Sequence, residues 1–448
     1  MATKAIAIWA LALNYTSLST PVLDIATKSI YNWAGCAIGG YDQAAPVAAL
    51  AAVTPFLGSQ GNSTIFGNGM LVDAQTAALI NGVASHADDY DDTHRDNPIH
   101  PSGPVLSALF AVAEWKAPVL GEDFVTAFIA GVEAECKLGV SVYPAHYELG
   151  WHITSTVGSI GAAVAVGKLL GLNTTQMQQA ISIASVQVTG MHDSFGTDTK
   201  PFHVGRASQN GMMAALLAQA GLSGALNGLE ADKGWTHVVS TQENLKAEVD
   251  TLGKTWEISL NTFKPYPCDR IIHAAIDGWI QLRAQALEKG LNIADIIRVG
   301  ARTNPMVLFL TDKPNITTGV EGKFSVYHVA AVALLYGEAT PTQFTDEVVR
   351  NATVAALREK VTVVNDETVT EHEASVTVEF ADGTKLEYHV EHALGSFENP
   401  LDDKFLKTKF IEQVTRSIGQ AKAEKAFSAY IGIANATDVG ALGRSYRT

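Results

Sequence analysis

Cysteine is scarce in this sequence. Three cysteines occur in 448 residues, and they are Cys36, Cys136 and Cys268. The odd number and the wide spacing argue against a disulfide framework and against the paired cysteines of a structural zinc site. We therefore expect a reducing compartment and a cytoplasmic location.

Basic residues are outnumbered. The chain has 31 Lys and Arg against 46 Asp and Glu, which gives a formal net charge of -15. A surface that binds nucleic acid needs a basic excess, so this composition argues against a nucleic-acid partner. A small anion would need a pocket that gathers cations locally.

Long apolar runs and cofactor motifs are missing as well. No run reaches the roughly 20 apolar residues of a membrane span, so we expect no membrane partner. Residues 5–13 resemble the apolar part of a signal peptide, but no clean cleavage site follows, and we expect them to form the first core helix. Without a GxGxxG, P-loop or pyridoxal-phosphate signature, the sequence predicts no cofactor.

The chain is long enough for a large core and two domains. Hydrophobic residues make up 47% of it. Residues 1–265 are rich in alanine, leucine and glycine at helical spacing, and this pattern returns at 400–448. Residues 266–399 contain strand patterns instead. We therefore predict a mainly α protein: a large all-helical domain built from both chain ends, and a smaller α+β lid domain.

The strand patterns of the smaller domain are specific. Residues 296–303 and 360–365 are typical strands, and 374–391 alternate like a hairpin around Asp382 and Gly383. The expected inward-facing hairpin side chains are Val376, Val378, Phe380, Leu386, Tyr388 and Val390.

The segment 81–105 has the highest density of aspartate and histidine side chains in the sequence. It contains five aspartates and three histidines within fifteen positions. Helical spacing places His86, Asp89 and Thr93 on one face. Because Pro98 and Pro101 cannot continue a helix, we expect the helix to end near His94, with His100 on a loop that folds back over Asp89.

Three other interpretations of this cluster stay open. It could be a solvated acidic helix end. The sequence DDYDD at 88–92 also matches the magnesium-binding DDxxD pattern of terpene synthases, although the partner motif is missing and 365–373 lacks its hydroxyl residue. His86, Asp89 and His94 have the right types for zinc, but their spacing matches no known zinc motif.

Two further segments carry candidate residues. His152 precedes Thr154 and Ser155, which are good N-caps, so it could stand at a helix start that favours a carboxylate. The alternative is a structural histidine. Lys200 lies on a constrained loop before Pro201, with His203 and Arg206 close by. It could equally be an ordinary surface lysine.

The junction between the two predicted domains carries a third set. Lys264, Arg270 and His273 lie within ten residues, and clefts between domains are preferred ligand sites. Cys268 could act as a nucleophile with His273, but no third orienting group is visible, so a packed cysteine is the better interpretation.

Together these residues suggest acid and base chemistry on a small di- or tricarboxylate. His100 and His152 would transfer protons, Asp89 would orient or exchange one, and cations would stabilise the charge that develops beside a carboxylate. The cations are Lys200, Lys264 and Arg270. From a different class, the chain could be a carboxylate-binding protein without catalysis.

The same segments resemble the MmgE/PrpD family, which contains 2-methylcitrate dehydratases, cis-aconitate decarboxylases and iminodisuccinate epimerases. The resemblance spans nearly the whole chain. It is carried by NGVASHADDYDD, HPSGPV, AGVE, GWHITSTVGSIGAA, GKLLGL, KPFHVGRASQNG, FKPYPC, HAAID and GKFS. It implies a helical domain with an α+β lid, a homodimer, and an active site between domain and lid.

The resemblance also implies that Asp89, Thr93, His100, His152, Lys200 and Lys264 line the active site, and the segments described above supply the other candidates. We predict catalytic roles for Asp89, Thr93, His100, His152 and Lys200, substrate contacts for His86, Lys264, Arg270, Arg206 and His273, and neither a metal nor a cofactor. The predicted reaction is dehydration of 2-methylcitrate or a related alkylcitrate. Decarboxylation and epimerisation are alternatives on the same scaffold.

Two departures from the family argue against decarboxylation. In animal cis-aconitate decarboxylases a histidine follows the junction lysine by five residues, and here that position is Asp269. The aromatic residue expected soon after the FS of GKFS is replaced by His328, with Tyr327 beside it.

Overall fold

The computed structural model describes residues 1–58 and 61–445, and the chain in it divides into two compact units. The helical unit comprises Met1–Ala87, Asp91–Thr262 and the chain from Asp402 onward. The small unit comprises Asp88–Tyr90 and Phe263–Leu401. The predicted mainly α class is confirmed. Among the described residues, no helix combines the length and the apolar character that crossing a membrane requires.

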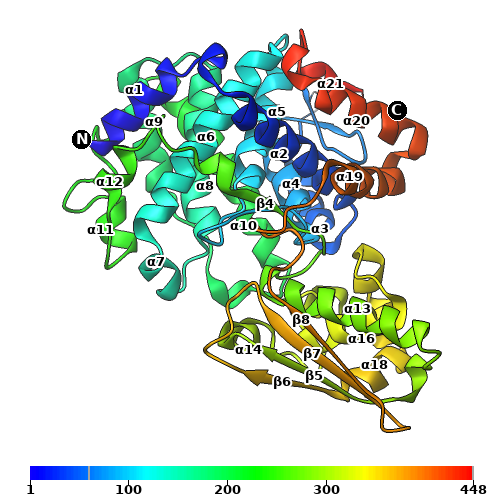
Figure 1. The fold of residues 1–448 in the computed structure, drawn as a ribbon. Coiled ribbons are helices and arrows are strands. Elements are labelled where there is room, and N and C mark those ends of the chain that lie inside the picture. The colour runs from blue at the N-terminus through cyan, green and yellow to red at the C-terminus, as the bar shows by residue number, and fades with distance from the viewer. Residues whose placement is uncertain (59–60, 446–448) are drawn as a thin grey trace. The chain divides into compact units, whose positions relative to one another are not determined.

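The helical unit is built from both ends of the chain (Figure 1). Its helices are α1 Ala2–Ala12, α2 Thr20–Gly39, α3 Ala44–Val53, α4 Ala74–Ala87, α5 Ser102–Trp115, α6 Gly121–Val142, α7 Ala145–Glu148, α8 Ile153–Leu169, α9 Thr174–Ser185, α10 Thr199–Gln219, α11 Trp235–Val239, α12 Leu245–Val249, α19 Asp403–Ile418, α20 Gln420–Ile431 and α21 Gly440–Arg444. Short antiparallel strands pair as β1 Ser63–Thr64 with β2 Leu71–Val72, and a second ladder joins β3 Asp92–His94 to β4 Asn261–Phe263.

Helix α8 lies in the core of this unit. It packs against α5, α6, α9 and α10, and its residues from Ile153 to Gly167 are all buried. This burial follows from the sequence, which is apolar or small nearly all round the helix. A Cβ on Gly211 of α10 would come 2.3 Å from the carbonyl oxygen of Ser159, so only glycine allows α10 to approach α8 this closely.

The C-terminal segment completes the helical unit. Helix α19 packs along α2, where the rings of Tyr31 and Phe410 meet edge to face with centroids 6.3 Å apart. A Cβ on Gly39 would come 2.9 Å from the Cβ of Gln413. The first and last parts of the sequence therefore share one core.

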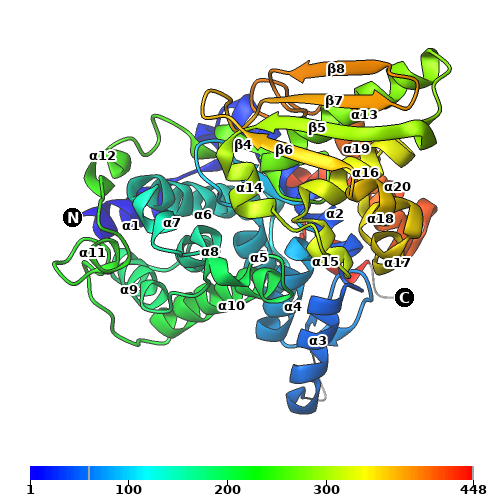
Figure 2. The ribbon, with the colours of Figure 1, turned by 90° about the horizontal axis from the view of Figure 1, so that it is seen from below.

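The small unit is a four-stranded sheet with helices packed on it (Figure 2). The strands are β5 Ile296–Thr303, β6 Val361–Asn365, β7 Ala374–Phe380 and β8 Lys385–Val390, in the order β6-β5-β7-β8. Only β5 and β6 are parallel. The helices are α13 His273–Glu288, α14 Pro305–Thr311, α15 Gly319–Gly322, α16 Val326–Tyr336, α17 Asp346–Arg350 and α18 Ala352–Arg358.

The predicted hairpin forms with one exception. Along β7 the residues alternate between buried and partly exposed, and Gly383 takes the left-handed turn conformation with φ +86. Trp279 of α13 shares the core cluster with the inward side chains. Tyr388 was expected to be buried too, but it keeps 36% of its surface exposed. Its strand β8 is one of the two edge strands of this sheet, so it has a neighbouring strand on one side only.

The helix that carries His86 ends earlier than the sequence suggested. Helix α4 ends at Ala87, not near His94, and the chain enters β3 after a turn in which Asp89 has φ +50. A run of aspartates is unfavourable at a helix C-terminus, where the helix dipole presents partial negative charge. The predicted helical face of His86, Asp89 and Thr93 therefore does not exist.

Candidate active site

The acidic turn at 88–92 is buried. Asp88 and Asp89 expose 3% of their surface, and Asp91 and Asp92 expose none. The interpretation as a solvated helix end is therefore wrong. Buried carboxylates need partners, and the four aspartates find them in two different sets. Asp91 and Asp92 contact the helical unit, whereas Asp88 and Asp89 contact the small unit.

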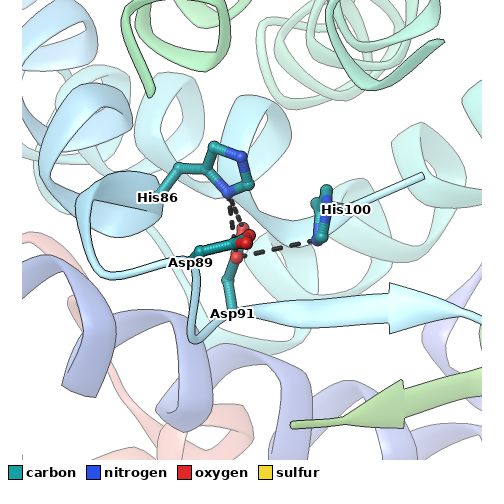
Figure 3. A group of neighbouring side chains, drawn as sticks. All are labelled: His86, Asp89, Asp91 and His100. Atoms are coloured by element: carbon teal, nitrogen blue, oxygen red, sulfur yellow. Dashed lines mark hydrogen bonds and ion pairs between the residues drawn. The ribbon is translucent and has the colours of Figure 1, made fainter. Parts of the chain in front are cut away.

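Asp91 lies between two histidines of the helical unit. Nδ1 of His86 is 2.9 Å from both carboxylate oxygens of Asp91, and Nδ1 of His100 is 3.6 Å from one of them. Figure 3 shows these three residues with Asp89, which precedes Asp91 on the same turn. Nδ1 of His100 also lies 2.9 Å from the carbonyl oxygen of Asp92. Because a carbonyl oxygen only accepts, His100 carries its hydrogen on Nδ1.

Thr93 and Thr154 fix the position of His100. The hydroxyl of Thr93 lies 3.2 Å from Nδ1 of His100, and the hydroxyl of Thr154 accepts the backbone N–H of His100 at 3.1 Å. Thr154 was expected to cap α8, but the N-cap residue is His152, and no side chain caps this end. Ser155, the other expected cap, donates instead to the carbonyl oxygen of His203 at 3.1 Å.

Four histidines form a row through the helical unit, which we call the histidine row: His100, His86, His152 and His203. Successive ring centroids are 4.6, 6.0 and 5.3 Å apart. All four side chains are buried. At the end of the row, Nδ1 of His152 lies 3.0 Å from Nδ1 of His203.

Burial keeps the end of the row neutral. It lowers the pKa of His152 well below its usual value, and the nearby charges of His203 and Lys200 add to this effect. Burial likewise lowers the pKa of His203 to about 4. Nε2 of His152 is buried and has no hydrogen-bond partner among the described residues. A neutral imidazole with such a nitrogen can accept or supply a proton.

Lys200 brings a positive charge to this end of the row. It lies in the first turn of α10 and exposes 5% of its surface, so the interpretation as an ordinary surface lysine is wrong. Its Nζ is 5.0 Å from the ring centroid of Phe195, and that ring is 5.1 Å from the His152 ring. Arg206 lies further along α10 and donates a hydrogen bond to the side chain of Gln209 on the same helix.

Asp92 is held by neutral donors. Its Oδ2 accepts hydrogen bonds from the Ser102 hydroxyl and the Asn261 amide, each at 2.5 Å. Complete burial, followed by the charge of Asp91, raises the pKa of Asp92 to about 7. Asp92 is thus able to hold a proton near neutral pH, next to the carboxylate that supports the histidine row.

The small unit neutralises the other two aspartates with lysines. Nζ of Lys264 donates to the carboxylate of Asp89 at 2.8 Å and to its carbonyl oxygen at 3.1 Å. Lys323 donates to Asp88 at 2.9 Å. All four side chains are buried. Because lysines compensate Asp88 and Asp89, the structure does not support a DDxxD magnesium site.

The remaining candidates of the small unit do not form a nucleophilic site. The Cys268 thiol is buried, and burial raises its pKa well above the usual value. Nε2 of His273 lies 3.3 Å from the carbonyl oxygen of Cys268, so it contacts the backbone there. Arg270 Nη2 lies 3.7 Å from Glu371. Cys268 is therefore a packed cysteine.

The structure brings only some of the possible metal ligands close together. Nε2 of His94 lies 3.0 Å from Glu257, so the proposed zinc set of His86, Asp89 and His94 does not assemble. His86, Asp91 and His100 belong to a group whose possible ligand atoms lie within 4.8 Å of one another. A cation bound by His86 through Nδ1 would have to displace the hydrogen that this nitrogen shares with Asp91.

Sequence reasoning missed five residues of these sets: Asp88, Asp91, Asp92, His203 and Lys323. Asp91 was missed because the predicted helix reached His94, whereas α4 ends at Ala87. Lys323 stands in the GKFS segment, where only the aromatic pattern drew attention. His203 was visible as a neighbour of Lys200, but no spacing rule connects it to His152, which lies 51 residues earlier.

Comparisons with known proteins give a consistent result. The family model for the MmgE/PrpD N-terminal domain matches residues 4–248, and the model for the MmgE/PrpD C-terminal domain matches residues 266–430. A cis-aconitate decarboxylase of Aspergillus terreus is 27% identical over 408 residues, which are 85% of this chain and 83% of that protein. The Mus musculus cis-aconitate decarboxylase is 27% identical, with 86% and 81% covered. The 2-methylcitrate dehydratase of Salmonella typhimurium is 25% identical, with 85% and 84% covered.

Proposed function

Because the chain belongs to the MmgE/PrpD family, we propose that it is a cofactor-independent lyase that dehydrates 2-methylcitrate or a related alkylcitrate. The observation that carries this proposal is the end of the histidine row. Nε2 of His152 is buried and has no hydrogen-bond partner in the part of the chain that the structure describes, and the charge of Lys200 is close enough to lower the pKa of His152. A base and a cation side by side suit a reaction that removes a proton beside a carboxylate.

The chemistry follows from the protonation of these residues. Neutral His152 would take the proton from the carbon next to a carboxylate, and Lys200 would stabilise the negative charge that develops there. The neighbouring hydroxyl group then leaves as water, and this step needs a proton donor. We assign that role to the His100 end of the row, although the roles of His100 and His152 could be interchanged.

The cations differ in which groups they act on. Lys264 and Lys323 each bind an aspartate within the small unit. The charge of Lys200 acts on His152, the proposed base. We therefore assign the substrate charge first to Lys200. Contacts of Lys264 and Arg270 with further carboxylates of the substrate stay predictions.

Decarboxylation is the second candidate. It is favoured by the named relatives from Aspergillus terreus and Mus musculus, which are cis-aconitate decarboxylases at 27% identity. The departures at Asp269 and His328 weigh against it. His328 is buried, and its Nε2 lies 2.9 Å from the carbonyl oxygen of Gln343. Epimerisation of iminodisuccinate is a third possibility, because the three reactions share a carbanion-like intermediate and differ in the group that leaves.

One experiment separates these reactions. The purified protein, treated with a chelator, is incubated in deuterated water with 2-methylcitrate, cis-aconitate or iminodisuccinate, and the products are followed by NMR. An alkene formed from 2-methylcitrate supports the proposal. Carbon dioxide and a dicarboxylate formed from cis-aconitate would establish decarboxylation, and deuterium incorporation with inversion would establish epimerisation. A rise in melting temperature without any turnover would indicate a carboxylate-binding protein.

A further inference from the structure

His152 and His203 share a hydrogen bond of an unusual kind. Their Nδ1 atoms lie 3.0 Å apart, so one of these nitrogens carries a hydrogen and the other offers its lone pair. Burial favours the neutral form of both rings. Two arrangements are therefore open, and they differ in which histidine donates.

The two arrangements give His152 opposite properties. If Nδ1 of His152 donates, its Nε2 has a free lone pair and can act as a base. If Nδ1 of His203 donates, the hydrogen of His152 moves to Nε2, which can then act as an acid. The other rings of the row lack this choice. His100 faces a carbonyl oxygen that only accepts, and His86 faces the carboxylate of Asp91.

The surroundings hold this pair in place. Gly190 has φ +94, and a Cβ on it would come 3.0 Å from Nδ1 of His203 and 3.1 Å from the Cβ of His152. The carbonyl oxygen of Gly190 accepts the backbone N–H of His152 at 3.1 Å. Ser155 donates to the carbonyl oxygen of His203. A side chain at position 190 would thus enter the space that the two rings occupy.

We propose that His203 is a positioning residue that lets His152 exchange between its two tautomers, so that Nε2 can be either base or acid. This inference rests on the proposed function only in giving Nε2 a substrate to act on. When Nε2 of His152 takes a proton, the Nδ1 hydrogen passes to Nδ1 of His203, and His203 releases its Nε2 hydrogen to water. His152 is then neutral again, with the abstracted proton on Nε2. In the reset, Nε2 of His152 releases this proton to water, the hydrogen on Nδ1 of His203 passes back to Nδ1 of His152, and Nε2 of His203 regains a proton from water. One proton has then passed from substrate to water, and it replaces the proton that His100 gives to the leaving hydroxyl group.

Histidine-selective 15N NMR of the ligand-free protein tests the inference directly. The signals of His152 are assigned by their loss in His152→Gln. Lys200, His86 and His100 also influence the pKa of His152, so spectra are recorded across a pH range. In the wild-type protein we expect the two ring nitrogens of His152 to show shifts averaged between both tautomers. In His203→Leu they should move toward the values of one fixed tautomer.

Two further variants keep the test decisive. His203→Gln retains a donor and an acceptor, so it should restore much of the activity that His203→Leu loses, and it is the variant to use if His203→Leu does not fold. His146→Leu is the matched control. It removes another buried histidine of the helical unit, whose nitrogens contact Val239 and Thr156, and it should leave the His152 signals unchanged.

The outcomes separate the inference from the proposed function. Unchanged His152 shifts in both His203→Leu and His203→Gln would overturn the role of His203, even if citrate-like substrates are turned over. Shifted signals in a protein that turns over none of these substrates would support the role of His203 while the proposed function fails. In an active enzyme, His203→Leu should lower kcat about tenfold or more and change its pH profile, with little effect on KM.

Discussion

Gly205 of α10 lies directly against Gly82 of α4: a Cβ on Gly82 would come 2.7 Å from the Gly205 Cα. A Cβ on Gly205 would come 2.4 Å from the carbonyl oxygen of Leu79. This contact joins the helix that carries His86 to the helix that carries Lys200 and His203. The distance between these parts of the site is therefore fixed by contact between backbone atoms, and a change in side-chain conformation cannot alter it.

We expect Gly205→Ala to lower the free energy of unfolding by about 1–3 kcal/mol, the usual cost of overpacking. The measurement is urea denaturation. Gly58→Ala is the control, because a Cβ there meets nothing within 4 Å. Equal stability of the two variants would show that the α4 and α10 helices can separate without cost.

His152→Gln should lower kcat by about 100-fold or more, the usual scale of acid or base help, with little change in melting temperature. The reason is that Nε2 of His152 makes no hydrogen bond within the described residues that folding would lose. His146→Gln is the matched control and should affect stability more than rate, because both of its ring nitrogens contact protein atoms. A folded His152→Gln with a near-normal rate would make His152 a structural histidine.

Lys200→Met keeps the length and the apolar stem but removes the charge. It should lower kcat/KM about tenfold or more, which is about 1.4 kcal/mol of transition-state stabilisation. Lys168→Met is the comparison. Lys168 donates to the carbonyl oxygens of Ala10 and Leu13, so its loss should lower the melting temperature and spare kcat/KM. Unchanged catalytic efficiency in Lys200→Met would remove α10 from the substrate site.

Because of Asp92, the free energy of unfolding should decrease as the pH rises toward neutrality. Its pKa is raised from 3.8 to about 7 in the folded protein, so the folded state holds a proton that the unfolded state releases. The contribution of Asp92 to the free energy of unfolding therefore decreases between about pH 4 and 7.

Asp92→Asn cannot ionise, so the stability of this variant relative to wild type should increase over the same pH range. Denaturation curves at several pH values measure this difference, with Asp382→Asn in the exposed hairpin turn as control. Parallel pH dependence of wild type and Asp92→Asn would contradict the raised pKa.

We also expect a homodimer, as the family resemblance implies. Light scattering at micromolar concentration should give about twice the chain mass of 47.5 kDa. The mass of a single chain under these conditions would contradict the prediction.

The regular elements were predictable because their periodicity is local. The strand at 296–303 and the hairpin at 374–391 were placed correctly, since alternation and an Asp-Gly turn specify them without help from distant residues. The mainly α class followed from helical spacing over hundreds of residues. The exposure of Tyr388 was not predicted, because alternation shows which face of a strand a side chain is on and not where that strand lies in the sheet.

The contacts of the candidate site were only partly predictable. The residue types near His86 and Lys200 indicated polar chemistry, but the end of α4 depends on a left-handed Asp89 that no sequence period reveals. The pairing of His152 with His203, and of Asp88 with Lys323, joins segments far apart in the chain. Such pairs are set by tertiary packing, so one sequence alone does not specify them.

The position of the turn Asp88–Tyr90 in the chain affects how the small unit could be expressed as a separate module. It belongs to the small unit by its contacts, although residues 91–262 of the chain separate it from the rest of that unit. A fragment spanning 263–401 would contain Lys264 and Lys323 but neither Asp88 nor Asp89. The pairs of Lys264 with Asp89 and of Lys323 with Asp88 would then be lost, and removing one partner of a buried ion pair is destabilising. Expression of the small unit as a separate module should therefore require that the acidic turn be grafted onto it.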